Sequence, residues 1–240
     1  MDSIHQGLKK YHHWQKTRDG QWLTYLEKTS LSRLLSGKDY NMMLQFGGVP
    51  LLDPFCPKDG FYYHVDPSHE EVSTGYQVQC SLLQTPFFSG DFELIVSPHM
   101  HELSISPSLL FQEFYRLLQD QGILIIYGIK RFGLWGGQHV WSPKDYLPWA
   151  EHLLSEDAVK NELEQCGFSL QTSLHYGFAP LLDKQNKRQK GLILEGASRW
   201  LVPYPSNAYC MMFSKPSRPL TPLKWPKKIP MQPCLNIQNS

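Results

Sequence analysis

The feature that most constrains this chain is a strand–helix–strand pattern between Phe92 and Tyr127. Phe92–Val96 is a compact apolar run between turn residues, which favours a buried strand. Ser106-Pro107 is typical of a helix start, with serine as the cap and proline in the first turn, and Gly122 is expected to end that helix. Ile123–Tyr127 is the most apolar segment, so we expect it at the centre of a sheet covered on both faces. Short links between these elements predict parallel strands with a right-handed crossover.

The remaining segments continue this alternation of strands and helices. Further strands are expected over Asn41–Phe46, Phe61–Val65, Tyr76–Gln79, Phe168–Tyr176 and Ala208–Phe213. Helices are expected over Asp19–Ser36, with Asp19 as the cap, and over Pro143–Gln165, with a break near Ser155. Val49–Gly60 is rich in proline and is expected to be a loop. The order predicts an α/β domain with a doubly wound sheet.

Length and composition support one folded domain with short additions at both ends. The chain has 240 residues, where a domain usually has roughly 100–200. We expect an N-terminal segment over residues 1–18, the α/β domain over 19–214 and an extended tail over 215–240, where lysines and prolines occur without acidic residues. The net charge of +1 argues against a whole surface that binds nucleic acid or anionic membranes.

The cysteines and the apolar runs indicate the cellular compartment in which the protein is expected. The five cysteines are scattered and form no CxxC pair, which argues against a disulfide scaffold and against a structural zinc site. The longest aliphatic run, Ile123–Tyr127, is far shorter than the roughly 20 residues of a membrane helix. Met1–Lys10 is polar and has no apolar signal core. We therefore expect a cytoplasmic protein without a membrane partner.

Several local patterns occur in an order typical of one family. Phe61–Ser68 ends as "HVDPS", Cys80–Phe87 reads "CSLLQTPF", and "LLFQEFYRLLQDQGILIIYGI" follows as helix, turn and strand. Together these resemble the class I S-adenosylmethionine-dependent methyltransferases, in particular the type-11 methyltransferase domain, most closely over Tyr76–Trp135. The helix expected near the N-terminus, Asp19–Ser36, and the "FGLWG" loop, Phe132–Gly136, resemble a divergent bacterial subgroup. The resemblance implies a Rossmann-like, mostly parallel seven-stranded sheet whose last strand is antiparallel, with S-adenosylmethionine across the carboxyl ends of the first strands.

The resemblance also implies a set of cofactor contacts. Asp66, at the end of the second strand, would accept hydrogen bonds from both ribose hydroxyls. Ser81 would meet the adenine amino group, and Leu82 would pack on the ring. The full set of matching positions is Phe46, Gly47, Gly48, Asp66, Ser81 and Leu82. From the residues alone, Asp66 could instead end a strand by bonding a nearby amide, the two glycines could form an ordinary turn, and Ser81 could be a plain loop serine.

The segment after the fourth strand would face the methyl group and its acceptor. His99 is the candidate catalytic residue, as a general base, because an imidazole accepts a proton near neutral pH. Met100 and Trp135 would border the acceptor, although aromatic residues there could equally be ordinary packing. His99 and His101 are two apart, but no further ligand cluster accompanies them, so no metal is expected.

The chain departs from the family where the cofactor loop is expected. The usual pattern is an acid followed by three glycines at alternate positions, whereas Gln45, Gly47, Val49 and Leu51 stand here. This difference motivates an alternative function, a catalytically silent methyltransferase-like interaction or regulatory module. A third alternative is an RNA-associated module that acts through the tail. The leading hypothesis is methyl transfer from S-adenosylmethionine to an acceptor, small or macromolecular, that the sequence does not identify.

Overall fold

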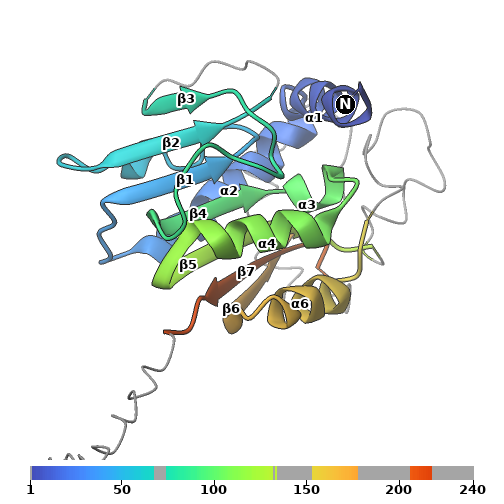
Figure 1. Ribbon diagram of the computed structural model, residues 1–240. Coiled ribbons are helices and arrows are strands. Elements are labelled where there is room, and N and C mark those ends of the chain that lie inside the picture. Colours follow the sequence, from blue (N-terminus) through green and yellow to red (C-terminus); the bar gives the residue numbers. More distant parts are fainter. Residues whose placement is uncertain (1, 68–73, 132, 134–152, 178–205, 218–240) are drawn as a thin grey trace, which may run out of the picture.

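The computed structural model describes residues 2–67, 74–131, 133, 153–177 and 206–217, and Figure 1 shows their arrangement. The strands are β1 (Met42–Phe46), β2 (Phe61–Val65), β3 (Tyr76–Val78), β4 (Phe92–Pro98), β5 (Leu118–Ile129), β6 (Ser169–Tyr176) and β7 (Ala208–Ser214). The helices are α1 (Asp2–Gln15), α2 (Arg18–Leu35), α3 (Met100–Leu103), α4 (Pro107–Leu117) and α6 (Glu156–Gln165), with a short 3-10 turn, η1, over Asp53–Phe55. The predicted loop over Val49–Gly60 therefore holds this single short turn.

The strands form one sheet in the order β3-β2-β1-β4-β5-β7-β6. Neighbours from β3 to β5 are parallel, while β7 runs antiparallel to both β5 and β6. The predicted fold, a mostly parallel seven-stranded sheet with an antiparallel last strand, is therefore confirmed. The predicted strand–helix–strand unit is β4–α4–β5, and its two strands are parallel neighbours as expected.

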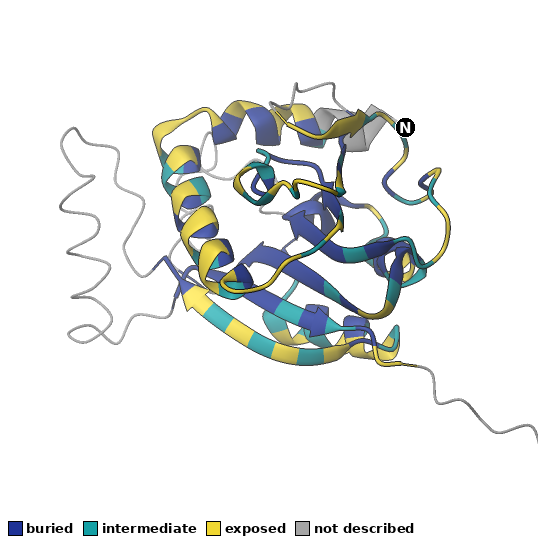
Figure 2. Cartoon of the chain, turned by 90° about the vertical axis from the view of Figure 1, so that its left-hand side faces the viewer, coloured by how far each residue is buried: buried dark blue, intermediate teal, exposed yellow. Residues whose placement is uncertain are grey.

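Helices cover both faces of the sheet. Figure 1 shows α4 and α6 in front of the sheet and α2 behind it. The helix surfaces turned toward the sheet are buried and the outer surfaces are exposed (Figure 2). Residues Leu124–Tyr127 of β5 are fully buried, because this strand lies between β4 and β7 and is covered on both sides. Their burial removes apolar surface from water, which stabilises a fold by roughly 25 cal/mol for each Å².

Two predicted helix boundaries differ from the structure. The cap of α2 is Thr17, whose hydroxyl accepts a hydrogen bond from the Gly20 amide at 3.2 Å; Asp19 lies inside the first turn. Helix α4 ends at Leu117, and Gly122 lies within β5 instead of ending the helix. A β-carbon on Gly122 would collide with Leu118 and with the Gln119 carbonyl, so this glycine serves close packing in an irregular strand.

The N-terminal segment, for which the sequence predicted no element, forms α1. Leu8, Tyr11 and Trp14 recur every third residue and are buried. A β-carbon on Gly20 would collide with the carbonyl of Trp14, so this glycine allows α1 and α2 to meet at a tight corner. Helix α1 is therefore part of the core structure.

Side-chain bonds fix two segments next to α4. The Glu113 carboxylate accepts from the Thr85 amide at 2.8 Å, and Arg116 donates to the carbonyl of Phe87 at 2.8 Å. Lys215 donates to the carbonyls of Tyr115 and Leu118 at 2.8 and 2.6 Å, at the end of α4. Lys215 is thus anchored to the domain, although the sequence placed it in the tail; residues 218–240 lie outside the described part.

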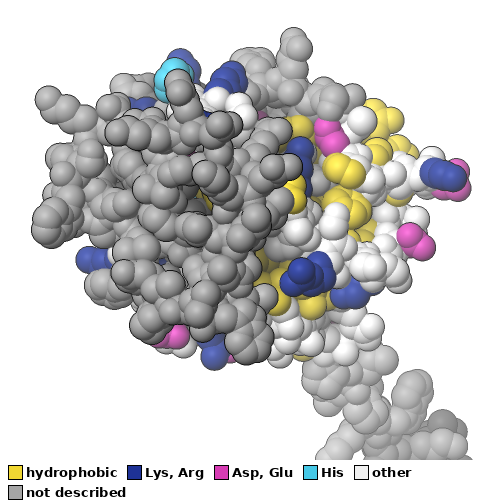
Figure 3. All heavy atoms as spheres, turned by 180° about the vertical axis from the view of Figure 1, so that it is seen from behind, with side chains coloured by type: hydrophobic (Ala, Val, Ile, Leu, Met, Phe, Trp, Pro, Cys, Tyr) yellow, Lys and Arg dark blue, Asp and Glu magenta, His cyan; other side chains and the backbone are white. Residues whose placement is uncertain are grey.

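One face of the molecule carries both signs of charge among its described residues. On the face seen in Figure 3, lysine, arginine and acidic side chains are interspersed with hydrophobic ones, in agreement with a net charge of +1. Within the described residues, no helix is both long and apolar enough to cross a membrane.

Candidate functional site

The carboxyl ends of β1, β2 and β4 meet at one edge of the sheet, because these strands are parallel neighbours. The chain leaves β1 toward β2 and β3 on one side, and β4 toward β5 on the other. Open α/β sheets bind ligands at such a switch point. The residues just beyond these strand ends are Gly47, Gly48, Asp66 and His99, and all four are buried. We call these four residues the strand-end site.

The two glycines form a turn that other residues could not easily replace. Gly47 and Gly48 have φ angles of 59° and 72°, in the left-handed region that favours glycine. A β-carbon on Gly47 would collide with the thioether of Met100, and one on Gly48 would lie 3.3 Å from the Tyr11 hydroxyl. The Gly47 amide donates to the carbonyl of Val65 at 2.7 Å, which ties the turn to β2. Both glycines therefore permit a close approach to the backbone at the strand-end site.

Gln45, which stands where the methyltransferases that the sequence resembles have an acid, organises the loop after β1. Its amide nitrogen donates to the carbonyls of Gly47 and Val49, both at 2.9 Å. Its amide oxygen accepts from the amides of Leu51 and Leu52 at 2.8 and 3.2 Å. Leu51 and Leu52 are buried in the hydrophobic core, while Val49 is half-buried. The Gln45 side chain therefore holds the loop from inside by four hydrogen bonds.

Asp66 is fully buried at the end of β2 and meets a residue of α1. Its carboxylate lies 2.9 Å from Nε2 of His12, whose side chain is also buried. The Asp66 amide donates to the carbonyl of Val78 at 3.2 Å, which holds the ends of β2 and β3 together. Helix α1 thus lies over the carboxylate that the sequence assigned to the ribose.

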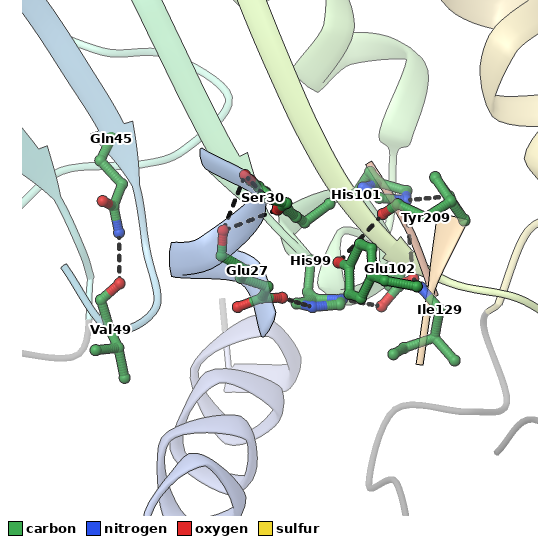
Figure 4. Close-up of polar contacts among 11 residues, drawn as sticks. Glu27, Ser30, Gln45, Val49, His99, His101, Glu102, Ile129 and Tyr209 are labelled. Carbon is green, nitrogen blue, oxygen red and sulfur yellow. Dashed lines mark hydrogen bonds and ion pairs between the residues drawn. The ribbon is translucent and has the colours of Figure 1, made fainter. Parts of the chain in front are cut away.

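His99 lies between two buried carboxylates, as Figure 4 shows. Its Nε2 is 2.7 Å from Glu27 of α2, and its Nδ1 is 2.9 Å from Glu102 of α3. Glu102 also accepts from the amide of Ile129, at the end of β5, at 2.6 Å. His101 continues the contacts, with its Nε2 at 3.0 Å from the Tyr209 hydroxyl. This network joins α2, the end of β4, the end of β5 and β7.

These contacts set the protonation of the histidines. Burial lowers the pKa of His99, but Glu102 and Glu27 outweigh burial and raise it to about 10. Burial raises the pKa of Glu102, and the neighbouring His99 brings it below its ordinary value. Burial lowers the pKa of His101 to about 4, against the opposing effect of Glu102. An imidazolium that donates from both nitrogens has no lone pair for a proton, so this arrangement does not suit the general-base role expected for His99.

The structure also describes Met100, which was expected beside the acceptor, and Ser81 and Leu82, which were expected at the adenine. Met100 is fully buried and packs over Gly47. Leu82 is buried as well. Ser81 is exposed, and its hydroxyl accepts from the amide of Leu83 at 3.3 Å, within its own turn. Trp135, expected near the acceptor, lies outside the described residues. Among those residues, no group of three or more His, Cys, Asp and Glu side chains could hold a metal ion.

Sequence reasoning missed three residues that the structure brings to this edge: Tyr11, His12 and Glu27. The ring of Tyr11 is 5.8 Å from the ring of His99, centre to centre. Burial and then Glu27 raise the pKa of the Tyr11 hydroxyl well above its ordinary range. Glu27 had a readable signal, because it occupies the apolar face of α2 between Leu23 and Leu31, one helical turn from each.

Part of the chain, including the strand-end site, matches a known protein family. Residues 47–126 match the model of the methyltransferase domain family. Among curated proteins, none matches the chain. The matched segment begins at the glycine turn and ends in β5, so it includes Gly47, Gly48, Asp66 and His99.

Solved structures share the fold at low sequence identity. A SAM-dependent methyltransferase from Thermotoga maritima, described as a possible histamine N-methyltransferase, is 14% identical, with a TM-score of 0.61, over 89% of this chain and 99% of that one. The N-methyltransferase NodS from Bradyrhizobium japonicum, in complex with S-adenosyl-L-homocysteine, is 14% identical with a TM-score of 0.58, over 88% and 99%. The [4+2]-cyclase SpnF is 12% identical with a TM-score of 0.54, over 80% and 81%. These structures confirm the predicted fold, and the family match over residues 47–126 supports the resemblance to class I methyltransferases. The cyclase shows that the fold alone does not fix the reaction.

Proposed function

We propose that this chain, which has the fold of the class I S-adenosylmethionine-dependent methyltransferases, binds that cofactor at the strand-end site and transfers its methyl group to an acceptor. One observation carries the proposal: a turn of two left-handed glycines after β1 lies beside a buried carboxylate after β2, at the switch point of the sheet. The family match over residues 47–126 supports it.

The chemistry of Asp66 suits the ribose of the cofactor. A carboxylate has two oxygens with about four lone-pair sites, so it can accept from two neighbouring hydroxyls. The contact with His12 uses one oxygen, Oδ2, and a carboxylate can accept further bonds beside it. Hydrogen bonds to a charged group stabilise a complex by roughly 1.5–3 kcal/mol. Asp66 is therefore the polar anchor of the proposed site.

The neighbouring residues would shape the rest of the cofactor site. Gly47 and Gly48 would let the cofactor approach the backbone. The ring of Phe46 packs edge-on against the ring of Phe114, with 4.8 Å between the ring centroids. Phe46 would therefore contribute its backbone to the cofactor site. Leu82, and the exposed Ser81 next to it, would lie on the adenine side.

Access to Asp66 requires the side chains of α1 that cover it to move. Asp66 is fully buried beneath His12, and Tyr11 lies against Gly48. A ligand that reaches the carboxylate must displace these side chains or bind when α1 has shifted. After closure, α1 would exclude water from the bound cofactor, which favours transfer of the methyl group to the acceptor instead of to water.

The bound cofactor supplies a sulfonium methyl group with its own leaving group, so the protein's task is alignment. Met100 packs over Gly47 and would border the acceptor, together with Trp135. The Glu27–His99–Glu102 network would hold α2 and the ends of β4 and β5 in a fixed arrangement around the methyl group.

Titration calorimetry with S-adenosylmethionine and S-adenosylhomocysteine tests the proposal. We expect saturable binding that Asp66→Asn weakens tenfold or more, because the neutral amide loses charge-assisted acceptance of both hydroxyls. Asp59→Asn is the matched control, since Asp59 is exposed in the loop before β2, and it should leave affinity unchanged. Thermal unfolding of each variant shows that the fold is intact.

The alternative function makes the opposite prediction for the same titration. A silent module would give no binding heat at about millimolar ligand, where a site of even weak affinity fills. Equal affinities of the wild type and Asp66→Asn would place any binding elsewhere. Where binding is found, formation of S-adenosylhomocysteine with a panel of amine, hydroxyl and carboxylate acceptors identifies the acceptor class.

A further inference from the structure

We infer that Gln45 is a positioning residue for the cofactor loop, and that its amide replaces the scaffold which acid and glycines provide in related proteins. This inference rests on the proposed function. It assigns the unusual loop a defined role: the buried side chain of Gln45 holds the loop Gly47–Leu52 ready for the cofactor.

The hydrogen bonds around Gln45 demand an amide. Two carbonyls, those of Gly47 and Val49, face its nitrogen, and two amides, those of Leu51 and Leu52, face its oxygen. The reverse orientation would set oxygen against carbonyls and NH₂ against amides, so the contacts fix which atom is which. Gln45 is fully buried, and so are its bonds to Gly47, Leu51 and Leu52; these backbone groups would lose a buried hydrogen bond if the side chain were removed.

A carboxylate at this position would satisfy the two backbone amides of the loop but not its two carbonyls. A glutamate could accept from the amides of Leu51 and Leu52, but it would place negative charge where the carbonyls of Gly47 and Val49 now receive donors. The acid that is usual in the family is therefore incompatible with this loop. The replacement of glycines by Val49 and Leu51 and the replacement of the acid by Gln45 are parts of one arrangement.

Further contacts transmit the position of the loop to the strand-end site. Nε2 of His64, in β2, lies 3.3 Å from the carbonyl of Gly47, the same carbonyl that Gln45 holds. The Tyr62 hydroxyl, also from β2, reaches the amide oxygen of Gln45 at 3.4 Å. Gln45 thus ties the glycine turn to the strand that carries Asp66. Loss of its amide should disturb the spacing between the glycine turn and the carboxylate.

Gln45→Glu tests the inference, with Gln79→Glu as the matched control. Gln79 directly follows β3 and, unlike Gln45 in β1, is exposed and makes one hydrogen bond, to the carbonyl of Pro67. At pH 7.5 we expect Gln45→Glu to lose most of the hydrogen-exchange protection of the Leu51 and Leu52 amides and to bind S-adenosylhomocysteine at least tenfold more weakly. At pH 5, a protonated carboxyl can donate to one carbonyl, so protection factors and affinity should partly recover. Gln45→Leu, which cannot titrate, should show the loss without the recovery.

The two measurements separate this inference from the proposed function. Hydrogen exchange is read without ligand, so it judges Gln45 even if the wild type binds no cofactor, a result that would refute the proposed function alone. Unchanged protection and affinity in Gln45→Glu would overturn the inference and leave the function standing. If the variants fail to fold, hydrogen exchange of the wild type still tests the inference. Rapid exchange of the Leu51 and Leu52 amides, relative to the amides of β1, would contradict the inference.

Discussion

We expect the free energy of unfolding to fall by about 3 kcal/mol between pH 6.5 and pH 9, because His99 is protonated in the fold and neutral in the unfolded chain over this range. The ordinary pKa of histidine is 6.5; burial alone would lower the pKa of His99, but the carboxylates of Glu102 and Glu27 outweigh burial and raise it to about 10. A group whose pKa is raised on folding stabilises the fold fully below its unfolded pKa, and this contribution is lost as the pH rises toward the folded pKa. Each pH unit in this window corresponds to about 1.4 kcal/mol. Since His99 is fully buried, solvent screens its pairs little.

Urea unfolding followed by tryptophan fluorescence at several pH values measures this slope. His99→Gln should remove the alkaline slope and destabilise the fold by roughly 3–5 kcal/mol, because two buried carboxylates lose their cation. His175→Gln is the control, since it removes an exposed histidine beside Glu156 and should keep the slope. A flat profile in the wild type, or an unchanged slope in His99→Gln, would refute the assigned charge. If His99→Gln does not fold, ¹⁵N spectra of the wild-type imidazole at pH 8.5 must show both nitrogens protonated.

Three further predictions concern single side chains. Gly48→Ala should destabilise the fold by about 1–2 kcal/mol in urea unfolding, because the residue has a left-handed backbone and would press on Pro98 and Tyr11; unchanged stability would contradict this. Lys215→Met should cost about 2 kcal/mol in the same assay, because the carbonyls of Tyr115 and Leu118 lose a charged donor, whereas Lys38→Met, at an exposed position, should cost nothing measurable. His12→Ala should speed association of S-adenosylhomocysteine several-fold in stopped-flow measurements, because Asp66 is then uncovered more easily; a slower association would mean that His12 guides the ligand.

Much of the fold could be predicted because its apolar runs are compact. The runs at Phe61–Val65 and Phe92–Val96 became β2 and the core of β4, and turn residues on both sides marked their ends. Helix α1 was not predicted because its buried face combines apolar Leu8, Tyr11 and Trp14 with polar His12 and Gln15. Apolar periodicity detects a buried face only when that face is mostly apolar.

The candidate site could be predicted only where it follows strand ends. Gly47, Gly48, Asp66 and His99 all come directly after a strand, so their arrival at one edge follows from parallel pairing. The partners of His99 could not be read in the same way, because Glu27 lies 72 residues earlier in the chain. The sequence shows a histidine with a pKa near neutral, whereas tertiary contacts make it an imidazolium. Likewise, the sequence shows Gln45 only as a replacement for an acid, because its hydrogen bonds to the loop after β1 become apparent only in the structure.

A crystal structure of the protein with saturating S-adenosylhomocysteine would show whether the cofactor binds at the strand-end site. We predict that the ligand lies along the edge formed by β1, β2 and β4, with both ribose hydroxyls within hydrogen-bonding distance of the Asp66 carboxylate and the glycine turn beneath it. An Asp66 still covered by His12, with the ligand absent or bound at another surface, would contradict the proposed site.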